Sequence, residues 1–179
     1  MTQIYADATV LIALGNAGRL DLLSTFDDYV TVPDTVVTEV TGEPAASNLH
    51  AARDSGGIAF SGSLDLFDEM ERAKDEAKEL LNEEETNGDV VIIGNTIRQR
   101  RKNVTVAVLS DDRRVRRVAE GLGATVTGTI GVVVRAVSDG ELTGEEGKKL
   151  VERLDERGLH MTGELRQRAI ELIEDAARD

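Results

Sequence analysis

The apolar run Val104–Leu109 constrains the fold more than any other feature of the chain. It is apolar at almost every position, as expected of a strand that is covered on both faces of a sheet. It ends at the acidic segment 110–112, and helical spacing then resumes at Val115, Val118, Ala119 and Leu122. A buried strand followed at once by a helix is typical of parallel α/β sheets. We therefore predict an α/β protein.

Strand and helix patterns alternate along the rest of the chain. We predict further strands at residues 4–6, 29–32, 58–60 and 123–126. Apolar residues at helical spacing predict helices at 10–23 (a pair), 34–40, 48–53, 64–86, 115–122, 130–137 and 144–179. No repeat or linker divides the chain, so we expect one domain, residues 1–137, with a helical C-terminal extension, residues 138–179, packed on it.

Residues 89–97 carry conflicting signals. Their β-branched side chains favour a strand, whereas an aspartate directly after a glycine favours the start of a helix. Propensity alone predicts a strand here.

The composition limits the classes of protein that the chain can belong to. Its 179 residues are 40% hydrophobic and include no cysteine, which allows one core without disulfides and excludes thiol chemistry. No apolar run approaches the roughly 18 residues of a membrane span, and the N-terminus has no basic leader, so we expect a cytoplasmic protein. The chain also lacks a G-x-S-x-G elbow and the glycine-rich loops that cradle nucleotide phosphates.

The charge first argues against a nucleic-acid partner. A formal net charge of −13 at pH 7 disfavours non-specific attraction to a polyanion in dilute salt. However, 16 of the 21 cations are arginine, a bias that we interpret as halophilic adaptation. In molar salt the Debye length falls to about 3 Å, so short-range contacts decide binding. The net charge therefore does not exclude nucleic acid.

Five acidic residues occupy special places in the predicted elements. Asp7 ends the first strand, Asp89 follows a glycine at a possible helix start, and Asp111 and Asp112 follow the strongest strand. The fifth is Glu39. Hard divalent cations take oxygen ligands, and carboxylates brought together from separate elements repel one another unless a cation neutralises them. If the fold converges these residues, they form a metal site; any one alone can equally be a cap or a turn former.

The surroundings distinguish Glu39 from the other acidic residues of the chain. The neighbouring residues Val36, Val37 and Val40 predict a helix face near the core, where an unpaired acid is costly. The run Glu83–Glu85, by contrast, is interpreted as a solvated face.

Four motifs, taken in order, resemble those of PIN-domain ribonucleases. The nearest branch in pattern is the VapC-like prokaryotic proteins, which share a Gly-Thr-x-Gly-Val turn, here at residues 128–132, and a helical tail resembling residues 150–173. The resemblance covers nearly the whole chain. The four motifs are Ala6-Asp7-Ala8-Thr9-Val10-Leu11-Ile12-Ala13-Leu14, Val32-Pro33-Asp34-Thr35-Val36-Val37-Thr38-Glu39-Val40, Gly88-Asp89-Val90-Val91-Ile92-Ile93 and Val108-Leu109-Ser110-Asp111-Asp112-Arg113.

The resemblance implies a three-layer α/β/α sandwich with a mainly parallel central sheet, and a helix at residues 89–97. It implies a metal-dependent endoribonuclease, with Mg²⁺ or Mn²⁺ as cofactor and RNA as substrate. The implied ligands are Asp7, Glu39, Asp89 and Asp112. Asp111 stands in the variable slot of its motif and can share or take the role of its neighbour, while the hydroxyls of Thr9 and Ser110 support the ligands. A VapC-like toxin also implies a small antitoxin partner and a homodimer.

Two groups of cations flank the strand at 104–109 and are candidates for phosphate contacts. The group after the strand is the stronger candidate, because the group before it can equally be a helix surface covered with ion pairs. The groups are Arg98, Arg100, Arg101 and Lys102 before the strand, and Arg113, Arg114, Arg116 and Arg117 after it.

Two other functions stay open. A catalytically silent PIN-like nucleic-acid-binding or regulatory module would keep the sheet without productive metal binding. A phosphoryl-transfer domain also uses aspartates at strand ends. The sequence disfavours this second class, because Asp7-Ala8-Thr9 lacks the second aspartate of the phosphatase motif and no lysine follows a late strand.

Overall fold

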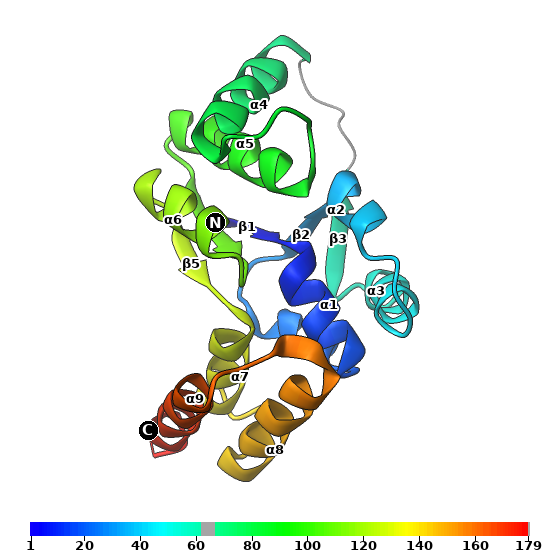
Figure 1. Cartoon of the computed structure of the whole chain (residues 1–179), viewed down its shortest axis with the longest axis vertical. Coiled ribbons are helices and arrows are strands. Elements are labelled where there is room, and N and C mark those ends of the chain that lie inside the picture. Colours follow the sequence, from blue (N-terminus) through cyan, green and yellow to red (C-terminus); the bar gives the residue numbers. More distant parts are fainter. Residues whose placement is uncertain (62–66, 179) are drawn as a thin grey trace.

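The computed structural model describes residues 1–61 and 67–178 and has an all-parallel, five-stranded central sheet, which Figure 1 shows with its flanking helices. The strand order is β3-β2-β1-β4-β5, and every neighbouring pair is parallel. This confirms the predicted α/β fold with its parallel sheet. The strands are β1 (Thr2–Ala6), β2 (Val30–Pro33), β3 (Ile58–Ser61), β4 (Thr105–Leu109) and β5 (Thr125–Thr127).

Helices cover the sheet in two groups (Figure 1). The chain adds β2 and β3 on one side of β1, then returns to add β4 and β5 on the other. Because crossovers between parallel strands are right-handed, this reversal puts the two sets of connecting helices on opposite faces. The first group is α1 (Ala8–Asn16), the 3-10 helix η1 (Leu20–Thr25) and α3 (Ala45–Asp54), and the second is α4 (Phe67–Leu81), α5 (Gly88–Arg101) and α6 (Arg113–Gly121).

The C-terminal helices join the first group. They are α7 (Thr129–Ser138), α8 (Gly144–Leu154), the short helix η2 (Asp155–Leu159) and α9 (Gly163–Ala176). They contact one another and α1 or η1. Leu150, Leu154 and Ile173 are buried in the same continuous core as the sheet, so the helical C-terminal region predicted from the sequence is present. A left-handed backbone at Gly158, with φ of 109°, separates the helices predicted over residues 144–179.

The segment 89–97 is helical, so the strand predicted from propensity is wrong there and the helix implied by the resemblance is correct. α5 begins at Gly88, and the side chain of Asn87 caps it by accepting a hydrogen bond from the Val90 amide at 3.0 Å. Residues 90–98 are all buried. Packing on every side therefore outweighs the β-branched preference of the side chains.

Other boundaries shift by a few residues. α4 ends at Leu81 rather than 86, and the expected start of this helix, residues 64–66, lies outside the described residues. β5 begins at Thr125 rather than 123, because Gly123 forms the left-handed turn before it, with φ of 81°. The short helix α2 spans Asp34–Glu39 at the carboxyl end of β2. Over the part of the chain that the structure describes, no helix combines the length and apolarity that a membrane span needs.

Candidate active site

The strand order creates a topological switch point between β1 and β4, the two strands from which the sheet extends in opposite directions. In open parallel sheets, ligands bind outside the carboxyl ends of the strands at such a point. The last residues of the two strands, Ala6 and Leu109, pair in register, and the Asp7 amide donates to the Leu109 carbonyl at 2.9 Å. Asp7 and the segment 110–112 therefore meet at this edge.

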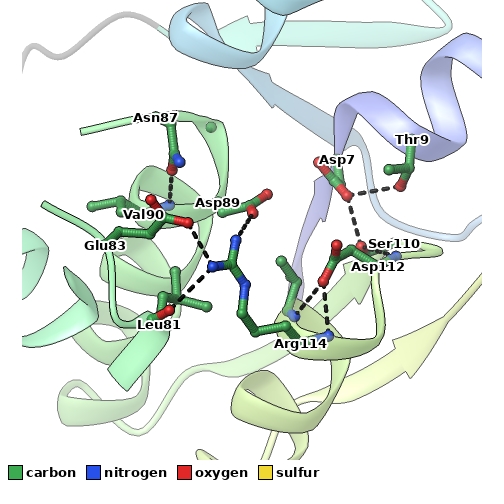
Figure 2. Close-up of polar contacts among 12 residues, drawn as sticks. Asp7, Thr9, Leu81, Glu83, Asn87, Asp89, Val90, Ser110, Asp112 and Arg114 are labelled. Atoms are coloured by element: carbon green, nitrogen blue, oxygen red, sulfur yellow. Dashed lines mark hydrogen bonds and ion pairs between the residues drawn. The ribbon is translucent and has the colours of Figure 1, made fainter. Parts of the chain in front are cut away.

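Asp7 is a buried carboxylate held on one side by two hydroxyl groups. It is only 2% exposed. Thr9 Oγ1 and Ser110 Oγ both donate to Asp7 Oδ2, each at 2.7 Å (Figure 2). Within the described residues no donor reaches Asp7 Oδ1. One oxygen is thus fixed by the protein, and the other stays available to a ligand.

The two aspartates after β4 have different tasks. Asp112 caps α6: its Oδ1 accepts from the amides of Arg114, at 2.7 Å, and Val115, at 3.0 Å. No described group donates to its Oδ2. Both oxygens of Asp111 are engaged by Thr129 at the start of α7, Oδ1 by the amide at 2.8 Å and Oδ2 by the hydroxyl at 2.5 Å. Of the two candidates, therefore, Asp112 keeps one carboxylate oxygen without a described donor, and Figure 2 shows its side chain near Asp7.

Asp89 lies in the first turn of α5 and is half-buried. Burial, together with the negative charges of Asp7 and Asp112, raises its pKa to about 6, although its hydrogen bond to Arg114 acts in the opposite direction. When neighbouring carboxylates raise the pKa of a carboxyl group in this way, the groups lie close together and their negative charges are only partly neutralised. Figure 2 shows the Asp89 carboxylate directed toward Asp7 and Asp112.

Glu39 lies at the end of α2 and is bound to the start of α5. Its Oε1 accepts from the Gly88 amide at 2.6 Å, and a Cβ at Gly88 would lie 2.5 Å from its Oε2. Only glycine therefore allows this approach. The expectation that Glu39 faces the core is wrong, because α2 is so short that its last residue reaches the open edge of the sheet, where Glu39 is exposed.

Arg114 is the one cation of the described chain that contacts this group of acids directly. Its Nη2 donates to Asp89 Oδ2 at 3.0 Å, and its Nη1 donates to Glu83 Oε1 at 2.5 Å and to the Leu81 carbonyl at 3.1 Å (Figure 2). Glu83, interpreted from the sequence as part of a solvated face, is instead an anchor for this guanidinium. Its only sequence signal is its position just before the turn that leads into α5.

The other candidate phosphate contacts lie outside this group of acids. Arg113 and Arg117 are exposed on α6 and form no ion pair within residues 1–61 and 67–178, whereas Arg116 lies beside Gly128. At the end of α5, Arg101 pairs with Glu76 of α4, and Lys102, which follows the helix, pairs with Glu69 of α4. Both therefore belong to a helix surface covered with ion pairs, the alternative interpretation of the group before β4.

The predicted metal ligands converge only in part. Asp7, Asp89 and Asp112 face one another, while Glu39 is held by Gly88 and Asp111 by Thr129. Within the described residues, no three acidic or histidine side chains form a ready metal-binding group. The three facing carboxylates nonetheless fit a hard cation chemically. They offer oxygen ligands, of which Asp7 Oδ1 and Asp112 Oδ2 have no protein donor, and their repulsion at Asp89 is what a cation would relieve.

Comparison with known proteins identifies the family of the chain. The family DUF3368, a PIN domain, matches residues 3–175, nearly the whole chain and including α8 and most of α9. No curated protein and no solved structure matches the chain significantly. The chain therefore belongs to the PIN-domain family.

Proposed function

We propose that this protein is a metal-dependent endoribonuclease that hydrolyses RNA phosphodiester bonds with Mg²⁺ or Mn²⁺ as cofactor. One observation carries the proposal: Asp7, Asp89 and Asp112 face one another at the switch point, with the pKa of Asp89 raised to about 6 by its buried, acidic surroundings. PIN domains are in general metal-dependent nucleases, and the chain belongs to that family.

The side chains divide the work of the site. A divalent cation held by the carboxylates would supply a Lewis acid and lower the pKa of an attacking water. Asp7, fixed by Thr9 and Ser110, and Asp112, fixed by its cap hydrogen bonds, would be ligands with little to reorganise. Asp89 completes this set, and its position also suits it to orient the water.

The two remaining acidic candidates have different proposed roles. Glu39, held by the Gly88 amide, is proposed as the fourth ligand. Asp111 accepts two hydrogen bonds from Thr129 and is proposed to hold the start of α7 in place beside the site.

RNA would approach the site across α6. The exposed side chains of Arg113 and Arg117, with Arg116 beside them, are proposed to contact phosphates on either side of the scissile bond. Their contacts are short-range and would persist at the salt concentrations of a halophilic cytoplasm, in which long-range repulsion from a net charge of −13 is screened.

The biological role that we propose is that of the toxin of a VapBC-like toxin–antitoxin pair. The motif order and the helical tail support this role, because they resemble VapC-like proteins over nearly the whole chain. A small antitoxin protein and a second copy of the chain are the corresponding partners.

The ends of the RNA products test the chemistry. Hydrolysis by an activated water leaves 5′-phosphate and 3′-hydroxyl ends and stops in EDTA. Products with 2′,3′-cyclic phosphate ends, or cleavage that continues in EDTA, would contradict the proposal.

A catalytically silent PIN-like module is the second candidate, and one contact favours it. Arg114 already places a positive charge on Asp89, where a metal-dependent site needs room for a cation. If calorimetry finds no Mg²⁺ or Mn²⁺ binding that depends on Asp7 and no RNA is cut, this second function replaces the first.

A further inference from the structure

A cavity of about 320 Å³ lies between the β1–β3 half of the sheet and the helix pair α4–α5. Its floor includes one row across three strands, because Tyr5 pairs in register with Thr31 and Thr31 with Ala59. The small side chain of Ala59 leaves space at the end of this row. The volume is at the lower limit for small-molecule pockets, so the cavity has room for a ligand the size of one nucleotide unit.

The floor of the cavity is polar, whereas the opposite face of the same strands is apolar. The neighbouring row on that face is Ile4, Val30 and Ile58, and all three are buried. Parallel strands that are covered on both faces are normally apolar on both. Thr31 and the hydroxyl of Tyr5 therefore place polar groups on the face of these strands that lines the cavity.

Several polar groups at the cavity have hydrogen-bonding capacity that the described protein does not use. Asn95 of α5 is 6% exposed, and its Oδ1 accepts only a long hydrogen bond of 3.4 Å from Arg98, while its amide nitrogen donates to no described group. The adjacent Thr96 is satisfied by the Ile92 carbonyl at 2.9 Å. The Thr31 hydroxyl likewise has no partner among residues 1–61 and 67–178. Asn95 and Thr31 both line the cavity, so a ligand or water there can complete their hydrogen bonds.

The cations that line the cavity, Lys74 and Arg98, already have protein partners, and the exposed Asp34 adds a negative charge, which disfavours an anionic ligand. The Lys74 ammonium pairs with Glu71 at 2.8 Å. The Tyr5 hydroxyl lies within hydrogen-bonding reach of Gln99, at 3.5 Å, and of Arg98, and burial raises its pKa, so it stays protonated. Amides and hydroxyls that both donate and accept match the edge of a nucleobase better than they match a phosphate.

Two elements connect the cavity to the acidic group. Tyr5 and Asp7 are two residues apart on and just beyond β1, roughly 7 Å along an extended chain, and Val91 of the cavity follows Asp89 by two residues on α5. We propose that the cavity holds the base of one nucleotide of the RNA substrate, beside the scissile phosphate. This assignment rests on the proposed ribonuclease function.

Binding of free nucleotides in EDTA tests the cavity without requiring cleavage. The four nucleoside 5′-monophosphates are titrated in high KCl into the wild type, Thr31→Val and Asn95→Leu, and amide NMR signals are followed. Thr31→Val keeps the shape of a strand residue, so it stays informative even if Asn95→Leu fails to fold. Thr105→Val at the start of β4 is the matched control. We expect one nucleotide to shift the Ala59 and Asn95 signals, and Thr31→Val to weaken its binding about five- to tenfold, the effect of one lost hydrogen bond. No shift at these residues, or equal binding by Thr31→Val, would overturn the proposal.

A second binding series separates the RNA substrate from a free nucleotide as the occupant. Fluorescein-labelled homopolymeric ribo-oligonucleotides of each base are bound in EDTA and followed by anisotropy. We expect the wild type to prefer the base found by NMR, and Thr31→Val to lose this preference while Thr105→Val keeps it. An unchanged preference in Thr31→Val would assign the cavity to a free nucleotide and overturn the substrate assignment. Neither binding series needs a metal. If the protein binds nucleotides and oligonucleotides as expected but cuts no RNA, the ribonuclease function is refuted while the base-binding cavity is not.

Discussion

Arg114 Nη2 and Asp89 Oδ2 lie 3.0 Å apart at the edge of the acidic group. The same guanidinium contacts Glu83 and the Leu81 carbonyl, so the connection between α4 and α5 fixes its position. It supplies positive charge where Asp7, Asp89 and Asp112 repel one another. Arg114 therefore partly substitutes for a cation and would compete with one.

Arg114→Gln should accordingly bind Mg²⁺ more tightly than the wild type. Removing a positive charge near the ligands removes repulsion of the incoming cation, and we expect a rise in affinity of about three- to tenfold at low ionic strength, with a smaller rise in high KCl. Isothermal titration calorimetry measures the change. Arg117→Gln, on the same helix but without an ion pair in the described structure, is the matched control. Equal or weaker Mg²⁺ binding by Arg114→Gln would show that the pair does not oppose the metal.

Glu83 should contribute to stability while its neighbour Glu84 does not. Glu83→Gln loses the charge of a half-exposed ion pair, which we expect to cost up to about 1 kcal/mol in the free energy of unfolding. Glu84 is exposed and has no ion pair among the described residues. Glu84→Gln should therefore change the free energy of unfolding by no more than about a few tenths of a kcal/mol. Urea denaturation of both variants checks this difference. If the two variants have the same free energy of unfolding, the run Glu83–Glu85 is a solvated face, as the sequence predicts.

The order of strands and helices could be predicted from the sequence because it follows apolar periodicity. The interior of α5 could not, because residues 90–98 have β-branched side chains whose helical state is imposed by burial on all sides. The candidate acids could be predicted from their positions at strand ends, at a helix start and on a largely apolar helix face. The residues that contact these acids in the folded protein could not be predicted. Glu83 reaches Arg114 across 31 positions, and Asp111 is held by Thr129 across 18 positions, and neither contact leaves a periodic signal. Similarly, the exposure of Glu39 depends on the length of α2, which local sequence does not fix.

The tasks of Asp111 and Asp112 can be separated by substitution. Asp112→Asn keeps a good helix cap but removes a proposed ligand charge, so cleavage should fall at least about a hundredfold with the unfolding midpoint nearly unchanged. Asp111→Ala breaks two hydrogen bonds to Thr129, and we expect a cost of about 1–3 kcal/mol in stability with residual cleavage. Parallel cleavage assays and urea titrations distinguish the two. The reverse pattern would identify Asp111 as the ligand.

The pH dependence of stability in EDTA should reveal Asp89. Its pKa is about 6 in the folded protein, above the ordinary value of 3.8, so between these values the folded state binds more protons than the unfolded state. Stability contributed by this group is therefore present at pH 4 and is lost as the pH rises to about 6. The difference in urea midpoint between wild type and Asp89→Asn should change between pH 4 and about pH 6, and it should be constant above about pH 7. Mg²⁺ affinity of the wild type should fall below about pH 6, as protons compete for the carboxylate. A midpoint difference that is independent of pH would exclude a raised pKa.

Cleavage of end-labelled RNA in high KCl, with Mg²⁺, Mn²⁺ or EDTA, tests the proposed ribonuclease function most directly. The wild type is compared with Asp7→Asn and Asp89→Asn, and with Asp54→Asn as an exposed control at the end of α3. We predict metal-dependent cleavage by the wild type and Asp54→Asn that both site substitutions abolish. Cleavage that survives in Asp7→Asn and Asp89→Asn, or that is the same in EDTA, would contradict this function.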